Sequence, residues 1–253
     1  MFLCVDHSEE RLPLAPTSTN DIDSKPPDHT EMTKIGMLTI GQSPRDDIIP
    51  PLKEILGPDH EILEAGALDD VTREEIDGLE FRPDDYLLVS RLRDGAEVKI
   101  HKRFILPRLQ KRIHELEKKG ATLTVIMCTG TFPQFESQGL VVTPQEILKG
   151  ILEASLKNGK LAVVYPAEEQ THKAEDDFGR DGITIYADHL SPYEDKADLD
   201  QLAERLTEQD PALIFLNCFG YSSKVKTIVA KRTGKPVIHS NVVVARVLKE
   251  LAN

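Results

Sequence analysis

Apolar runs of strand length alternate with segments of helical periodicity along most of the chain. Short continuous apolar runs indicate buried strands, whereas apolar residues recurring every three or four positions indicate one face of a helix. The pattern predicts strands at 34–40, 61–65, 86–90, 122–127, 160–165, 183–186, 212–216 and 236–239. It predicts helices at 46–56, 101–119, 144–157, 199–208, 222–232 and 241–251, with a weaker helical pattern at 168–178. Such alternation favours an α/β fold, a mainly parallel sheet with helices on both faces.

The first 31 residues differ from the rest, because they lack periodicity and are rich in Pro, Ser, Thr and Asp. A segment of this composition buries too little apolar surface to offset the entropy lost on ordering. We therefore expect a disordered extension at 1–31 and an α/β domain at 32–253. Met32, directly before the first strand, is a candidate for the natural start, and Cys4 is then irrelevant to the chemistry.

Two segments of the chain resemble one another. An apolar strand ends in Cys-x-Gly at Cys128 to Gly130, and another does so at Cys218 to Gly220. Eight strands in this order form either one sheet or two four-stranded halves, and the repeat favours two halves. The expected halves are about 34–130 with 236–253, and about 131–235. Duplication would place both cysteines at equivalent strand ends, where open α/β sheets bind ligands.

Both cysteines are candidates for acid–base chemistry. We expect backbone N–H groups and the positive end of a following helix to lower the pKa of each thiol. If Cys128 and Cys218 face opposite sides of one carbon acid, one removes a proton as thiolate and the other delivers one as thiol. That arrangement is two-base racemisation. The alternative is that both are small buried apolar residues, since free cysteine is often buried.

Polar residues at other strand ends are candidates for holding a substrate. Ser43 and Arg45 follow the first strand and could bind a carboxylate at a helix start, or Ser43 could cap the helix with Arg45 in solvent. Arg91 follows the third strand and is a candidate bidentate partner for an acid, or belongs to a solvated loop. Residues flanking the cysteines could donate hydrogen bonds to a substrate, namely Thr129, Thr131, Tyr221 and Ser222. Tyr221 and Ser222 could equally begin the next helix.

Composition narrows the class of protein. The formal net charge of −12 disfavours nucleic acid and anionic membrane surfaces as partners. No apolar stretch is long enough to cross a bilayer, and the N-terminus lacks a signal-peptide core, so we expect a cytoplasmic protein. Three cysteines do not suggest a disulfide framework. Metal-ligand spacings, the nucleotide-binding glycine patterns and GxSxG are absent, so neither a metal nor a nucleotide cofactor is expected.

These residues resemble the AroM family, within the aspartate/glutamate/hydantoin racemase superfamily. The resemblance covers Met32 to Asn253 and is carried by IGMLTIGQSPRDD from residue 35, CTGTFP from residue 128 and LNCFGYS from residue 216. It implies two pseudo-twofold-related parallel-sheet subdomains with the active-site cleft between them. Superfamily racemases use one cysteine from each half as acid and base without a cofactor, and these match Cys128 and Cys218.

The resemblance also bears on the substrate. Glutamate racemases carry Asp-Ser where this chain has Gln42-Ser43, so glutamate is not the expected substrate. The expected activity is racemisation or isomerisation of a small carboxylate or cyclic amide, with a homo-oligomer possible. The alternatives are a one-cysteine isomerase or decarboxylase, because the superfamily includes maleate isomerases and arylmalonate decarboxylases, and a non-catalytic small-molecule-binding protein of the same fold.

Overall fold

The computed structural model describes residues 32–252 apart from 194–195. The extension expected at 1–31, which includes Cys4, therefore lies outside the described part of the chain. Among the described residues, no helix has the length and apolar character needed to cross a membrane.

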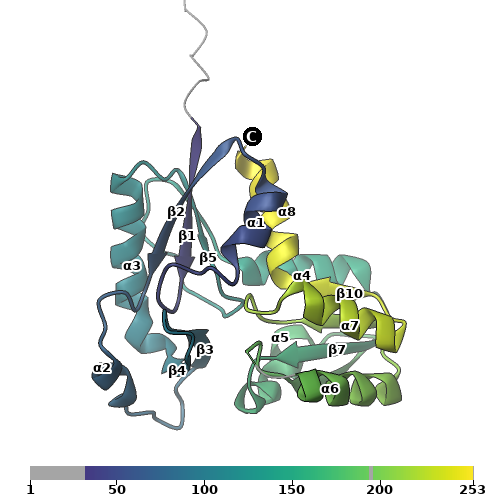
Figure 1. Ribbon diagram of the computed structural model, residues 1–253. Helices are drawn as coiled ribbons and strands as arrows, with labels where there is room; N and C mark the ends of the chain where they lie inside the picture. The colour runs from purple at the N-terminus through teal and green to yellow at the C-terminus, as the bar shows by residue number, and fades with distance from the viewer. Residues whose placement is uncertain (1–31, 194–195, 253) are drawn as a thin grey trace, which may run out of the picture. The chain divides into compact units, whose positions relative to one another are not determined.

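Two four-stranded parallel sheets organise the fold (Figure 1). The first has the order β2 (His60–Gly66), β1 (Thr33–Thr39), β5 (Leu123–Ile126) and β6 (Leu140–Val142). The second has the order β8 (Ile183–His189), β7 (Gly159–Tyr165), β9 (Leu213–Leu216) and β10 (Val237–His239). The two orders correspond strand for strand, which confirms the predicted pair of parallel-sheet halves. In this correspondence β5 is the counterpart of β9.

Helices connect and cover the strands. The longer ones are α1 (Ile49–Leu56), α3 (Lys102–Lys118), α4 (Pro144–Ser155), α6 (Lys196–Gln209), α7 (Ser223–Thr233) and α8 (Ser240–Ala252). The shorter ones are α2 (Arg73–Asp77), a 3-10 turn η1 (Glu168–Lys173) and α5 (Ala174–Phe178). The weak helical pattern at 168–178 thus corresponds to η1 followed by α5. An antiparallel hairpin of β3 (Leu87–Arg91) and β4 (Glu97–His101) precedes α3.

Apolar side chains from both sheets meet in one shared core. The central strands β5 and β9 are buried along their whole length, as expected for parallel strands covered on both faces. One buried cluster joins Val125 of β5, Phe215 of β9 and Leu248 of α8. Helix α3 covers the other face of the first sheet, opposite α1 and α8 (Figure 1). Helices α6 and α7 cover the other face of the second sheet.

Three elements were not predicted. Strands β4 and β6 and helix α2 were missed because β4 mixes charged and apolar residues, and the other two are three and five residues long. Strand β6 is the fourth strand of the first sheet, and β10 is the fourth strand of the second. The helix after β10, α8, packs mainly on α1, which belongs to the first half. Each half therefore takes its fourth strand from just beyond its Cys-x-Gly segment.

Candidate active site

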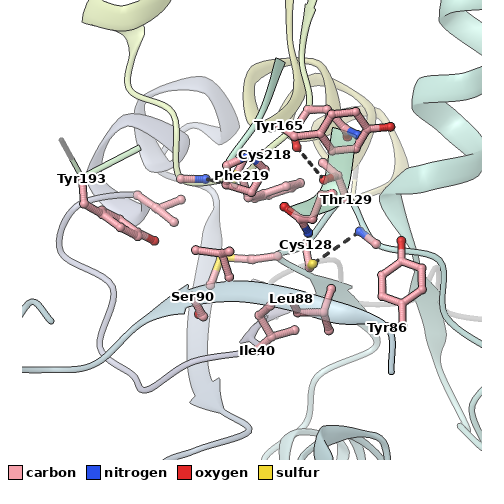
Figure 2. Close-up of a pocket in the computed structure, with 18 of the residues that line it drawn as sticks. Ile40, Tyr86, Leu88, Ser90, Cys128, Thr129, Tyr165, Tyr193, Cys218 and Phe219 are labelled. Carbon is pink, nitrogen blue, oxygen red and sulfur yellow. Dashed lines mark hydrogen bonds between the residues drawn. The ribbon is translucent and has the colours of Figure 1, made fainter. Parts of the chain in front are cut away.

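The two Cys-x-Gly segments line one cavity. Cys128 follows β5 and Cys218 follows β9, at the carboxyl ends of corresponding strands. Figure 2 shows both cysteines among the side chains that surround this space. Each cysteine lies at the carboxyl edge of its own sheet. The two sheets pack in one shared core, which brings these distant segments together.

Each thiol has the same local geometry. The backbone N–H of Gly130 donates to Cys128 Sγ over 3.3 Å, and that of Gly220 donates to Cys218 Sγ over 3.3 Å. A Cβ atom at Gly130 would lie 3.0 Å from Leu88, and one at Gly220 would lie 3.0 Å from Pro192. A side chain at either place would crowd the neighbouring wall of the cavity unless Leu88 or Pro192 shifted.

Burial disfavours the thiolate form of both cysteines, contrary to expectation. Burial raises the pKa of Cys128 to about 12 and that of Cys218 to about 11, although an N–H group donates to each sulfur. No helix directly follows Cys128, since residues 128–139 are irregular, and α7 begins only at Ser223. The predicted lowering of both pKa values was therefore wrong. Desolvation of the charged form outweighs the hydrogen bond.

Thr129 and Asn217 join the two cysteine segments. The Thr129 hydroxyl donates to the main-chain carbonyl of Asn217 over 3.1 Å. Both residues line the cavity. Thr129 was predicted from its place beside Cys128, whereas Asn217 was missed, although it directly precedes Cys218 in the second segment.

Arg45 lines the cavity with its charge already compensated. It is 4% exposed, and its guanidinium donates to both carboxylate oxygens of Asp47 at 2.8 Å. It also donates to the hydroxyls of Thr39 at 3.0 Å and Tyr193 at 3.1 Å. Although burial opposes ionisation of Asp47, the hydrogen bonds from Arg45 hold its pKa below the usual value. Arg45 is neither in solvent nor an open charge for a substrate.

Ser43 and Arg91 lie outside the cavity wall. The Ser43 hydroxyl donates to Asp69 Oδ2 at 2.8 Å, and its N–H donates to Asp69 Oδ1 at 2.7 Å. Arg91 Nε donates to the carbonyl of Gly95 at 2.9 Å, and its guanidinium carbon lies 5.2 Å from the centre of the Tyr193 ring. Ser43 thus orders the loop after β1, and Arg91 supports Tyr193 from outside. Neither reaches the cysteines.

Three other predicted residues also lie outside the cavity wall. Tyr221 is 1% exposed, and its hydroxyl donates to the carbonyls of Tyr165 at 2.8 Å and Leu190 at 2.7 Å. Ser222 is the N-cap of α7, where its hydroxyl accepts the N–H of Val225 at 3.4 Å. Thr131 is exposed and does not line the cavity. Tyr221 is thus packed in the core, Ser222 caps a helix and Thr131 faces solvent. The prediction that these three residues contact the substrate is therefore not supported.

The sequence did not reveal several polar residues of the cavity. Ser90, Gln170 and Asn217 line it. The side-chain oxygens Ser90 Oγ, Gln170 Oε1 and Asn217 Oδ1 are buried and have no hydrogen-bond partner. Unpaired buried polar atoms are rare in folded proteins, so these three are candidates for contact with a ligand. Ser90 ends a predicted strand, which was a usable signal. Gln170 and Tyr193 lie in irregular or weakly patterned segments that gave none.

The free space between these side chains is small. It amounts to about 30 Å³, enough for one or two waters and too little for an organic acid. The side chains of the rim must therefore move to admit a substrate. Figure 2 shows Tyr193 and Tyr86 on opposite sides of the cavity, with the two cysteines between them.

The fold places this chain among the racemase-fold α/β proteins. Similar solved structures include allantoin racemase from Klebsiella pneumoniae (16% identity, 87% of this chain and 86% of that chain, TM-score 0.56). They also include the maleate isomerase Iso from Pseudomonas putida S16 (15% identity, 87% of this chain and 93% of that chain, TM-score 0.56). Another is arylmalonate decarboxylase (18% identity, 87% of this chain and 92% of that chain, TM-score 0.53). This fold is thus common to racemases, isomerases and a decarboxylase.

The chain itself belongs to the AroM family. The family model described as AroM protein matches residues 35–252, which confirms the resemblance noted in the sequence. No curated protein matches the chain in sequence.

Proposed function

We propose that this protein is a cofactor-independent racemase or isomerase in which Cys128 and Cys218 act as acid and base. The supporting observation is that two thiols with matching geometry, from corresponding strand ends of duplicated halves, line one cavity. A pair of this kind suits a carbon acid with a C–H bond next to a carbonyl group.

The chemistry requires one thiolate and one thiol. The thiolate takes the α-proton, so the C–H bond breaks, an S–H bond forms and the electron pair moves into the carbonyl as an enolate. The second thiol then gives its proton to the opposite face, and its sulfur becomes the thiolate. The charge of Cys218 raises the pKa of Cys128, after the larger effect of burial. Ionisation of one thiol therefore disfavours ionisation of the other, so when one thiolate forms its partner remains a thiol.

Other cavity residues have supporting roles in this proposal. The unpaired Ser90 Oγ is a donor for the developing enolate oxygen. Thr129 is occupied by Asn217 and fixes the spacing of the two cysteine segments. Arg45 holds the Tyr193 hydroxyl at the wall. The active form needs neither metal nor cofactor in this scheme.

The test is exchange of solvent deuterium into the α-position of amino acids, hydantoins and hydroxy acids, together with loss of their optical rotation. We expect exchange with one of these classes, and a loss of about 10²–10⁴-fold in racemisation for either Cys128→Ser or Cys218→Ser. A variant that retains full turnover would favour a one-cysteine isomerase or decarboxylase. Binding without exchange would favour a binding protein and contradict the proposal.

A further inference from the structure

The two cysteine segments face walls of different origin. In the first half, the connection after β2 contains α2 and the β3–β4 hairpin before α3 begins. In the second half, α6 begins at Lys196, shortly after β8 ends at His189. The two sheets otherwise correspond strand for strand. The hairpin is therefore an element of the first half without a counterpart in the described residues of the second.

Leu88 of this hairpin lies beside Cys128. It lines the cavity and is 2% exposed. A Cβ atom at Gly130 would lie 3.0 Å from Leu88 Cδ2 and 3.5 Å from Cys128 Sγ, so the leucine methyl group and the sulfur flank the same point. Figure 2 shows the Leu88 side chain next to that of Cys128. A ligand group that approaches the sulfur from this side therefore meets Leu88.

The hairpin and the core hold Leu88 in place. Leu88 pairs with Ile100 of β4, and it belongs to the buried apolar cluster against which Cys128 packs. The carbonyl of the preceding residue, Leu87, accepts a hydrogen bond from Gln170 Nε2 at 3.1 Å. Gln170 comes from η1, so this bond joins the hairpin to the second half.

Two further contacts attach the hairpin to the second half. Lys99 of β4 forms an ion pair with Glu169 of η1, and Ser191 Oγ donates to Glu97 of β4. Because protein interiors are close-packed, a buried side chain that is held on several sides cannot yield without moving its neighbours. Leu88 is therefore a fixed part of the cavity wall.

We propose that Leu88 is a specificity-determining residue, which limits the size of the ligand group that lies next to Cys128. The free space of the cavity is about 30 Å³, so a change of even one methylene group in a fixed wall alters what fits. The inference concerns the site of the proposed racemase, and it rests on that function only in calling the ligand a substrate.

The test compares alkylation of the two thiols by N-ethylmaleimide and by N-phenylmaleimide, which differ in the size of one group. In both reactions a thiolate sulfur adds to the C=C bond of the ring. A C–S bond forms, the π bond breaks and the neighbouring carbon takes a proton from solvent. The ratio of the phenyl rate to the ethyl rate at one cysteine cancels the reactivity of that thiol. Peptide mass spectrometry measures this ratio separately at Cys128 and Cys218.

In Leu88→Ala we expect the phenyl-to-ethyl ratio at Cys128 to rise about tenfold over that of the unaltered protein, because the pocket gains space for the larger group. Leu88→Val should raise it less, and the ratio at Cys218 should stay unchanged in both variants. Ile100→Ala is the matched control, because Ile100 is buried and pairs with Leu88 but does not line the cavity. It should change neither ratio.

The inference is overturned if the Leu88 variants leave the Cys128 ratio unchanged, if Ile100→Ala raises it equally, or if the Cys218 ratio rises by the same factor. If Leu88→Ala does not fold, Leu88→Val and Ile100→Val provide the same comparison with one methyl group removed from each. Alkylation needs no turnover. A Cys128 ratio that responds to Leu88 without deuterium exchange in any compound would therefore support the size limit and contradict the racemase. Exchange together with unaltered ratios would do the reverse.

Discussion

The Thr129 hydroxyl donates to the main-chain carbonyl of Asn217 over 3.1 Å, which joins the residue after Cys128 to the residue before Cys218. This hydrogen bond crosses between the two halves at the edge where the thiols lie. It therefore fixes the separation on which two-base chemistry depends.

Replacing Thr129 by Val should loosen this link. The side chain keeps its shape but loses the donor, so we expect a loss of about 1 kcal/mol in the free energy of unfolding and a fall in exchange rate of about tenfold or more. Chemical unfolding and the deuterium-exchange assay measure the two effects. Thr227→Val is the control, because Thr227 donates only within α7, to the carbonyl of Ser223. Equal exchange rates in both variants would contradict the positional role of Thr129.

Replacing Ser90 by Ala should separate activity from stability. The Ser90 hydroxyl is buried without a partner, so its removal leaves the fold equally stable or slightly more stable. The exchange rate should nevertheless fall by about 10-fold or more, because the donor for the enolate is lost. Ser191→Ala provides the contrast, since Ser191 Oγ donates to Glu97 at 2.5 Å and its loss should lower stability. If the Ser90→Ala protein is less stable but fully active, the Ser90 hydroxyl stabilises the fold and is not a donor to the enolate.

Replacing Gly220 by Ala should displace Tyr193. The added Cβ would lie 3.2 Å from the Tyr193 hydroxyl and 3.0 Å from Pro192. We expect an activity loss of up to about 10²-fold, because shifts of about 1 Å near reacting groups have effects of that size. Gly150→Ala in α4 is the control. No atom lies within 4 Å of its added Cβ, so it should stabilise the helix by about 0.5–1 kcal/mol and leave activity unchanged.

Alkaline pH should raise activity and lower stability through the same two thiols. Their pKa values are raised from about 9 to about 12 in Cys128 and about 11 in Cys218. The folded state therefore holds these protons more tightly than the unfolded chain. The resulting stabilisation is fully present below pH 9 and is lost as pH rises through the folded values.

Urea unfolding of the protein and of a Cys128→Ala, Cys218→Ala double variant between pH 8 and pH 11 measures this effect. The double variant should lose less stability over that range, and the native protein should show an exchange rate that climbs with pH as thiolate forms. If the stability of the two proteins falls equally with pH, or if the exchange rate of the native protein no longer rises above pH 8, the raised pKa values are contradicted.

The local sequence determined most of the strands and helices, and it identified the two cysteines that share a cavity. Continuous apolar runs predicted the long central strands, since burial on both faces of a sheet requires them. The repeated Cys-x-Gly at Cys128 and Cys218 predicted two corresponding strand ends. Short elements such as β6 and α2 were missed because three to five residues carry too little periodicity.

Only the tertiary structure decided the electrical character of the site. The pKa of a thiol depends on what covers it, and the availability of Arg45 depends on Asp47 and on Tyr193, which is far away in sequence. Residue type gives each group its chemistry, but burial and distant neighbours set its charge and its access to a ligand, and those arise only when the chain is folded.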